Sequence, residues 1–139
     1  MAGVSITSAV GLKSGVTQYE ITWVSNASGD VSGSVSQMKM GTIIAVEFIP
    51  APGALQPTDL YDVDLVDAQG TSMFDDGAGT TIGANLSNAV SQHKVPLVGL
   101  TGVTIYRRWH HGGTAELRVS NAGDSNAGTV NVFVAEGVV

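Results

Sequence analysis

The sequence predicts an all-β fold, a single domain built as an antiparallel β-sandwich or jelly roll of about eight short strands. Apolar residues recur at every second position in several segments, which is the pattern of strands with one face on a core. Glycine accounts for 18 of the 139 residues and supplies the positive φ angles of tight turns. No segment has the length and period of a helix that crosses between parallel strands.

The first half of the chain alternates most clearly. Residues 18–23 are predicted as a strand with Tyr19, Ile21 and Trp23 on its apolar face. Turn-forming residues follow it, and the alternation resumes weakly over residues 31–35.

Residues 42–49 are apolar on both faces except for Glu47, as expected for a central, buried strand. Three prolines then exclude regular strand pairing through a loop of about ten residues. Residues 60–66 alternate again and predict the next strand.

The second half begins with residues 75–89, whose Gly, Thr and Asn predict a long surface loop, with a short helical turn at residues 86–90 as an option. Further strands are predicted at residues 95–97, 103–109, 115–119 and 130–134. The last two are predicted to pair as an antiparallel hairpin.

The N-terminal residues 1–14 alternate poorly and are predicted to be an edge strand or an arm that reaches a neighbour, with the arm preferred. Residues 15–139 are predicted to form the sandwich domain. The chain start lacks the basic cluster and apolar run of a signal peptide, and no stretch approaches 18 apolar residues. We therefore expect assembly in a cytoplasm and no membrane partner. No cysteine is present, so neither disulfides nor thiolate metal sites are expected.

The formal charge of −6, from 12 acidic and 6 basic residues, makes a general electrostatic grip on nucleic acid improbable. Six acids lie between residues 59 and 76, and four bases lie between residues 94 and 118. These two groups are expected to pair either within one subunit or between neighbours, and the sequence does not decide between the two.

Several strand and turn segments identify a resemblance that covers nearly the whole chain. The matching segments are residues 19–23, 25–33, 57–70, 83–86 and 117–134. In order and spacing they resemble a family of small proteins encoded among the head genes of tailed bacteriophages and prophages. The departures from the family are a longer loop at residues 75–81 and the unusual run at residues 107–111.

The resemblance implies a structural component of the virion. The favoured role is a head decoration, or cement, protein on the capsid surface. Such a protein binds the assembled lattice of the major capsid protein and stabilises it by mass action, and a homo-oligomer is expected, with a trimer favoured.

Two alternatives differ in what they bind. A receptor- or carbohydrate-binding module of a head or tail fibre would use exposed aromatic residues, for which Tyr106, Trp109 and His111 are the candidates. A tail or connector subunit would stack in rings. An enzyme is not expected, because no coherent set of nucleophile, acid and base stands out, and no cofactor is predicted.

The histidines are candidates for a metal or acid–base site. His93, His110 and His111 could combine with Asp75 and Asp76, since imidazole and carboxylate suit several metals. Nothing in their spacing requires it, and adjacent histidines on a strand point to opposite faces. The preferred interpretation is a polar turn without metal.

Asp62 and Asp64 alternate onto one strand face, where the preferred interpretation is a solvated surface. The alternatives are a calcium site that also includes Asp67, although most of a calcium loop pattern is missing, and an ionic contact with a neighbouring subunit.

The run at residues 107–111 suggests a binding patch, because Arg and Trp recur at the energetic centres of protein interfaces. Burial of the tryptophan in the core is the alternative. The predicted partner-binding residues are Lys13, Asp75, Asp76, Arg107, Arg108, Trp109, His110 and His111.

Overall fold

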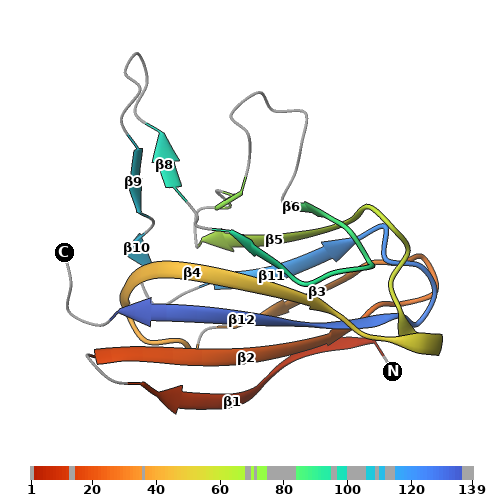
Figure 1. The fold of residues 1–139 in the computed structure, drawn as a ribbon, viewed down its shortest axis with the longest axis horizontal. Helices are drawn as coiled ribbons and strands as arrows, with labels where there is room; N and C mark the ends of the chain where they lie inside the picture. Colours follow the sequence, from red (N-terminus) through yellow and green to blue (C-terminus); the bar gives the residue numbers. More distant parts are fainter. Residues whose placement is uncertain are drawn as a thin grey trace.

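Two antiparallel sheets face each other across one core in the computed structural model (Figure 1). The structure describes residues 2–12, 15–35, 37–67, 70, 72–74, 84–94, 97–99, 106–108, 110–111 and 115–135. Within these ranges the all-β sandwich prediction is confirmed, with twelve strands and no α-helix. The same ranges accordingly contain no helix long and apolar enough to cross a bilayer.

Sheet A holds the long strands. Its order is β1 (Gly3–Gly11), β2 (Val16–Val24), β12 (Ala127–Ala135), β4 (Gly41–Pro50) and β10 (His110–His111), and β7 (Gln92–Lys94) also pairs with β4. Sheet B is smaller, in the order β3 (Val31–Ser34), β11 (Ala115–Ser120), β5 (Tyr61–Asp67) and β6 (Ala84–Leu86). A separate pair, β8 (Leu97–Gly99) and β9 (Tyr106–Arg108), projects away from the two sheets in Figure 1. A 3-10 turn, Gly53–Leu55, follows β4.

The inner faces follow the period-two pattern. Tyr19, Ile21 and Trp23 of β2 are at most 2% exposed, as predicted from their alternation. The Trp23 ring of sheet A meets the Tyr61 ring of sheet B with centroids 5.8 Å apart and planes tilted by 41°. Aromatic pairs at this separation add to the apolar area that the two sheets bury. The two sheets therefore share one core.

Gly128 of β12 is required by the position of Trp23. The two residues are opposite each other in the β2–β12 register, and a Cβ on Gly128 would lie 2.5 Å from Trp23 Cζ2. The indole thus lies directly over the backbone of the neighbouring strand. Only a residue without a side chain leaves this space.

The chain crosses between sheets A and B after β2, β3, β4, β6, β10 and β11. The predicted hairpin of residues 115–119 and 130–134 is wrong, because β11 belongs to sheet B and β12 to sheet A. Residues 121–126 instead turn the corner between the sheets. Ser25 Oγ donates a hydrogen bond to Gly123 O at 2.6 Å, and the Ala122 N–H donates to Gly29 O at 3.0 Å, which ties this corner to the one after β2.

Residues 3–11 form the edge strand that was one of the two predictions for the N-terminus. β1 pairs with β2 along its length, with a bulge between Ile6 and Ser8. Val4 and Ile6 pack against the core, whereas residues 7–11 are exposed. The alternation is weak because the second half of the strand has no buried face. Whether this segment reaches a neighbour stays a prediction.

The helical turn considered for residues 86–90 is wrong. Leu86 ends β6, which pairs with β5, and residues 88–90 form a bend. Ala84 and Leu86 are buried while Asn85 between them is exposed, so strand pairing with β5 places both apolar side chains in the core. Residues 75–83 lie outside the described residues.

We expect Gly128→Ala to destabilise the fold, because its Cβ would overlap the buried Trp23 ring. Overpacking of this kind costs about 1–3 kcal/mol in the free energy of unfolding, measurable by urea denaturation. Gly3→Ala is the matched control, since a Cβ there meets no atom within 4 Å. Equal unfolding midpoints for the two variants would contradict the assignment of the Trp23 position.

Burial raises the pKa of Tyr61 from 10.0 to about 12. The unfolded chain then loses this proton first as the pH rises, so the stability contributed by the neutral phenol is complete below pH 10 and is lost between pH 10 and 12. We expect the difference in unfolding free energy between the wild type and Tyr61→Phe to shift in favour of the phenylalanine variant across this window. A difference that does not change with pH would show that the phenol is not desolvated.

Candidate functional site

Half of the eight predicted partner-binding residues lie outside the part of the chain that the structure describes. Lys13, Asp75, Asp76 and Trp109 lie outside the described residues. Arg107 and Arg108 belong to β9, and His110 and His111 belong to β10, so their strand backbones are placed. Their role in binding stays a prediction.

The strand register separates the histidine positions. His93 of β7 is opposite Glu47 of β4, whereas His110 of β10 is opposite Thr42. Five residues along β4 correspond to about 17 Å. A metal site that combines His93 with His110 or His111 is therefore not supported by the backbone.

His93 instead belongs to a polar row on the outer face of sheet A. Its Nε2 lies 2.9 Å from Glu47 Oε2, and Asn131 Nδ2 of β12 donates to Glu47 Oε1 at 2.9 Å. On the other side of Asn131 in the register is Glu20 of β2, whose carboxylate accepts a hydrogen bond from Thr7 Oγ1 at 2.7 Å. The row crosses the sheet from β7 to β1. It holds its carboxylates by hydrogen bonds from neighbouring strands.

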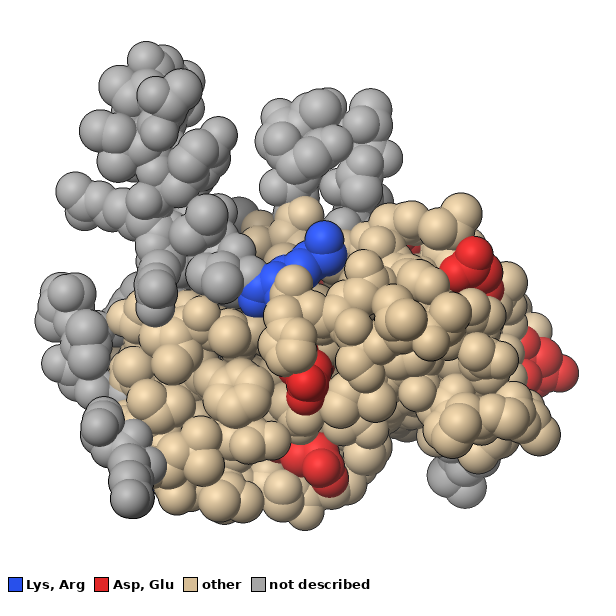
Figure 2. Space-filling view, in the orientation of Figure 1, with Lys and Arg blue, Asp and Glu red and all other residues tan. Residues whose placement is uncertain are grey.

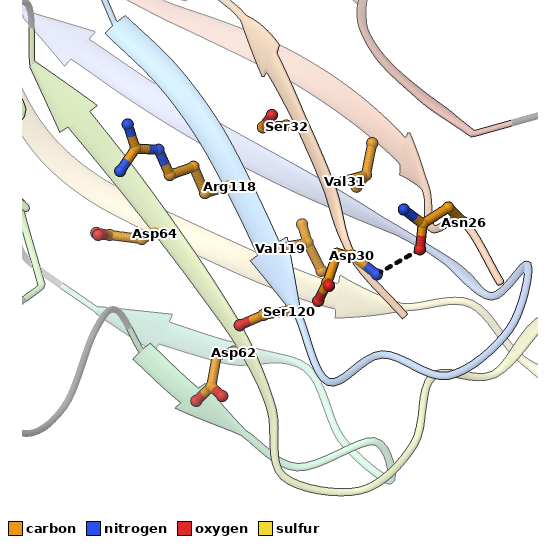
Figure 3. A pocket seen from close by; sticks show the side chains of 9 residues that line it. All are labelled: Asn26, Asp30, Val31, Ser32, Asp62, Asp64, Arg118, Val119 and Ser120. Atoms are coloured by element: carbon orange, nitrogen blue, oxygen red, sulfur yellow. Dashed lines mark hydrogen bonds between the residues drawn. The ribbon is translucent and has the colours of Figure 1, made fainter. Parts of the chain in front are cut away.

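The outer face of sheet B carries an open hollow of about 500 Å³ (Figure 3). It is lined by Asn26, Asp30, Val31, Ser32, Asp62, Asp64, Arg118, Val119 and Ser120. Figure 3 shows these side chains coming from the corner before β3 and from the three strands β3, β11 and β5. The corner is fixed locally, since Asn26 Oδ1 accepts hydrogen bonds from the backbone N–H groups of Ser28 and Asp30.

Asp62 and Asp64 of β5 point to this outer face, as predicted, but Asp64 is not solvated. It is only 2% exposed, because residues 72–74 fold back over the strand. Ser72 Oγ donates to Asp64 Oδ1 at 2.7 Å, and the Met73 N–H donates to Leu65 O at 2.8 Å. The ring of Phe74, 5.5 Å from that of Phe48, anchors this segment. The prediction of a solvated face is therefore wrong for Asp64, because nothing in the sequence indicates that residues 72–74 cover it.

Arg118 is a residue of the basic segment whose surroundings include an acid of the acidic segment of the same chain. Its Nε donates to Glu116 Oε1 at 3.0 Å, and it is directly opposite Asp64 in the β11–β5 register. The hydrogen bond and charge of Glu116, followed by the charge of Asp64, raise the pKa of the guanidinium. At this position the basic segment meets the acidic segment of the same chain. The exposed pair with Glu116 orients the side chain more than it stabilises the fold.

Two loops meet at the end of the sandwich where β4 ends and β5 begins. Residues 51–60 and 87–91 are tied by three hydrogen bonds: Gln56 Nε2 to Asn88 O at 2.8 Å, Asn88 Nδ2 to Pro57 O at 3.0 Å, and the Asn88 N–H to Asp59 Oδ1 at 3.1 Å. We call these two loops the loop end. Cross-bonded loops of this kind present a defined surface, since the hydrogen bonds fix their relative position.

The loop end exposes three large apolar side chains: Leu55 at 53%, Leu60 at 60% and Val90 at 57%. Leu60 also has a φ angle of +63°, the left-handed region that leucine rarely adopts. Asn85 Nδ2 donates to Leu60 O at 2.9 Å and holds this conformation. The exposure of these three residues was not predicted from the sequence, because an apolar residue beside a strand resembles a core residue in the sequence.

The described surface is otherwise poor in charge. In Figure 2 most of it is uncharged, the acidic residues form separate patches, and the basic residues form one short stretch. Only 13% of all residues in the chain are charged, about half the usual share. A surface of this composition presents few charged groups that would have to be desolvated against a partner.

We expect calcium to leave the melting temperature unchanged, because the two β5 carboxylates that line the hollow, Asp62 and Asp64, already accept hydrogen bonds. Asp62 accepts the amides of Asn85 and Asn121, one on each oxygen, at 2.8 and 2.7 Å. No group of three or more His, Cys, Asp or Glu side chains suited to a metal occurs in the described parts of the chain. If a calcium site existed, calcium at 100 times its Kd would stabilise the fold by about 2.7 kcal/mol. A thermal melt with and without calcium detects a change of this size.

No protein-family model matches the chain, and neither a curated protein nor a solved structure does.

Proposed function

We propose that this chain is a structural protein of a tailed-phage particle that attaches to the assembled capsid lattice as a cement protein and stabilises it. The resemblance to small phage head proteins supports the virion role. The low charge of the described surface supports a role in adhesion to protein. The loop end supports attachment through a defined apolar surface.

The observation that carries the proposal is the exposed, strained Leu60. A left-handed conformation costs an ordinary residue roughly 1–2 kcal/mol, which glycine avoids and asparagine reduces. Exposure of a leucine to water provides no compensation within the chain. Strained backbone positions cluster at sites that bind. Leu60 has this strain together with apolar exposure, and Leu55 and Val90 are further exposed apolar side chains of the same loop end.

The stabilising mechanism is mass action. A protein that binds only the assembled and expanded lattice shifts the equilibrium toward that lattice by RT ln(1 + [L]/Kd). Each contact can be modest, because many copies act on one particle. Three apolar side chains on a pre-ordered loop end fit a contact of this kind, since binding then orders few additional groups.

We expect Leu60→Asn to lower occupancy of capsids at least tenfold while the fold stays as stable as the wild type or becomes more stable. Asparagine tolerates the left-handed conformation and removes the apolar surface, so a loss of binding would not arise from unfolding. The probe is expanded heads purified from the phage or prophage that encodes the chain, with its gene deleted. Occupancy is measured by co-sedimentation, and stability by thermal melting.

Met40→Asn is the matched control. Met40 is 62% exposed and precedes the opposite end of β4, so its replacement should leave capsid occupancy unchanged. Full occupancy by Leu60→Asn would remove the loop end from the attachment surface. No binding of the wild type to heads would refute the cement role itself.

The hollow on sheet B favours a second candidate, a glycan-binding module of a fibre. Its carboxylate, amide and hydroxyl groups are of the kind that hydrogen-bond sugar hydroxyls, and it is open to solvent. Binding to a glycan array without binding to heads would select this candidate.

A further inference from the structure

β1 is the one long edge strand in the described part of the chain. The other strands at sheet edges are short: β3 has four residues, β6 and β7 have three each, and β10 has two. β1 has nine residues and pairs with β2 on one side only. An open edge presents unpaired N–H and C=O groups that pair readily with another strand.

The devices that usually protect an edge are scarce in β1. Over Gly3–Gly11 the strand has neither a charged residue nor a proline. Its one irregularity is the bulge between Ile6 and Ser8. Before the bulge the strand is covered on one face, since Val4 lies against Gly33 of β3. After the bulge both faces are exposed, and Val10 at 50% and Leu12 at 43% exposure continue the edge.

The absence of charge on residues 7–12 favours a second copy of the chain as the partner of this edge. Two chains of formal charge −6 repel each other in general, so a self-contact is favoured where the approaching surfaces carry no charge. Residues 7–12 are uncharged. The carboxylate nearest in register, Glu20 of β2, already accepts the hydrogen bond of Thr7 Oγ1 at 2.7 Å. A second copy of residues 7–12 thus brings no like charge to the edge.

We propose that two copies of this chain pair antiparallel through residues 7–11 of β1 and the adjoining Leu12, so that sheet A continues across a twofold axis. Ladder hydrogen bonds supply the register-specific attraction, as in other cases of strand addition. The same residues meet on both sides of a twofold interface, so Val10 and Leu12 of each copy are covered together. The pairing occurs in solution and does not depend on the proposed capsid attachment.

The first test is the mass of the full chain by sedimentation velocity over a range of concentrations. We expect the wild type to dimerise and Val10→Lys to weaken the dimer at least tenfold. Because position 10 is half exposed, the two melting temperatures should be equal at concentrations where both chains are monomeric. Val90→Lys, at 57% exposure on the loop end, is the matched control and should dimerise like the wild type. A wild type that stays monomeric or forms a trimer would overturn the proposal, as would an unaffected Val10→Lys dimer.

The second test uses the absence of cysteine, which makes any introduced thiol unique. Opposed residues of an antiparallel pair have Cα atoms about 4.5–5.5 Å apart, within the range that a disulfide spans. Among Ser8→Cys, Ala9→Cys and Val10→Cys, the position nearest the axis should cross-link to itself in high yield on mild oxidation, and Val90→Cys should not. Equal, low yields at all four positions would contradict strand pairing.

Discussion

The core shared by Trp23 and Tyr61 fixes which surfaces this protein can offer to a partner. Because side chains alternate along a strand, burial of Trp23 in sheet A and Tyr61 in sheet B commits every other residue of those strands to the inside. A slip of one residue would place Glu20 or Asp62 in the core. Within the described residues, the outer faces, the edges and the loop ends are then the places left for function, and each carries a different chemistry.

Carboxylates on both outer faces are held by hydrogen bonds from neighbouring strands. On sheet A, Glu47 is held by His93 and Asn131, and on sheet B, Asp62 is held by Asn85 and Asn121. These groups order neighbouring strands, since a carboxylate with donors on adjacent strands fixes their register. The exposed apolar side chains of the β1 edge and of the loop end make no such hydrogen bonds. This edge and the loop end are the surfaces on which an external partner has most to contribute.

The sequence was sufficient for the core and insufficient for the contacts between segments. Tyr19, Ile21 and Trp23 were predicted because their alternation reports burial directly. The β11–β12 hairpin was wrong because two alternating strands joined by a turn-rich segment look alike whether they pair or cross between sheets. The burial of Asp64 was not predictable, since it depends on the return of residues 72–74. Leu60 has no signal at all, because a left-handed φ at leucine is set by the surrounding loop.

The two proposed surfaces have a geometric consequence when they are considered together. Gly3 of β1 is opposite Val24 of β2, and Val24 is opposite Ala127 of β12, the strand that also pairs with the end of β4 that leads into the loop end. Antiparallel pairing through residues 7–12 therefore places the two loop ends at opposite ends of the joined sheet. At about 3.4 Å per residue, the two Gly3 positions lie roughly 45 Å apart. The two loop ends of such a dimer cannot occupy one site, and binding of the second becomes intramolecular once the first is attached. Pairing through β1 would thus turn a weak apolar contact into a clamp between two positions of a lattice.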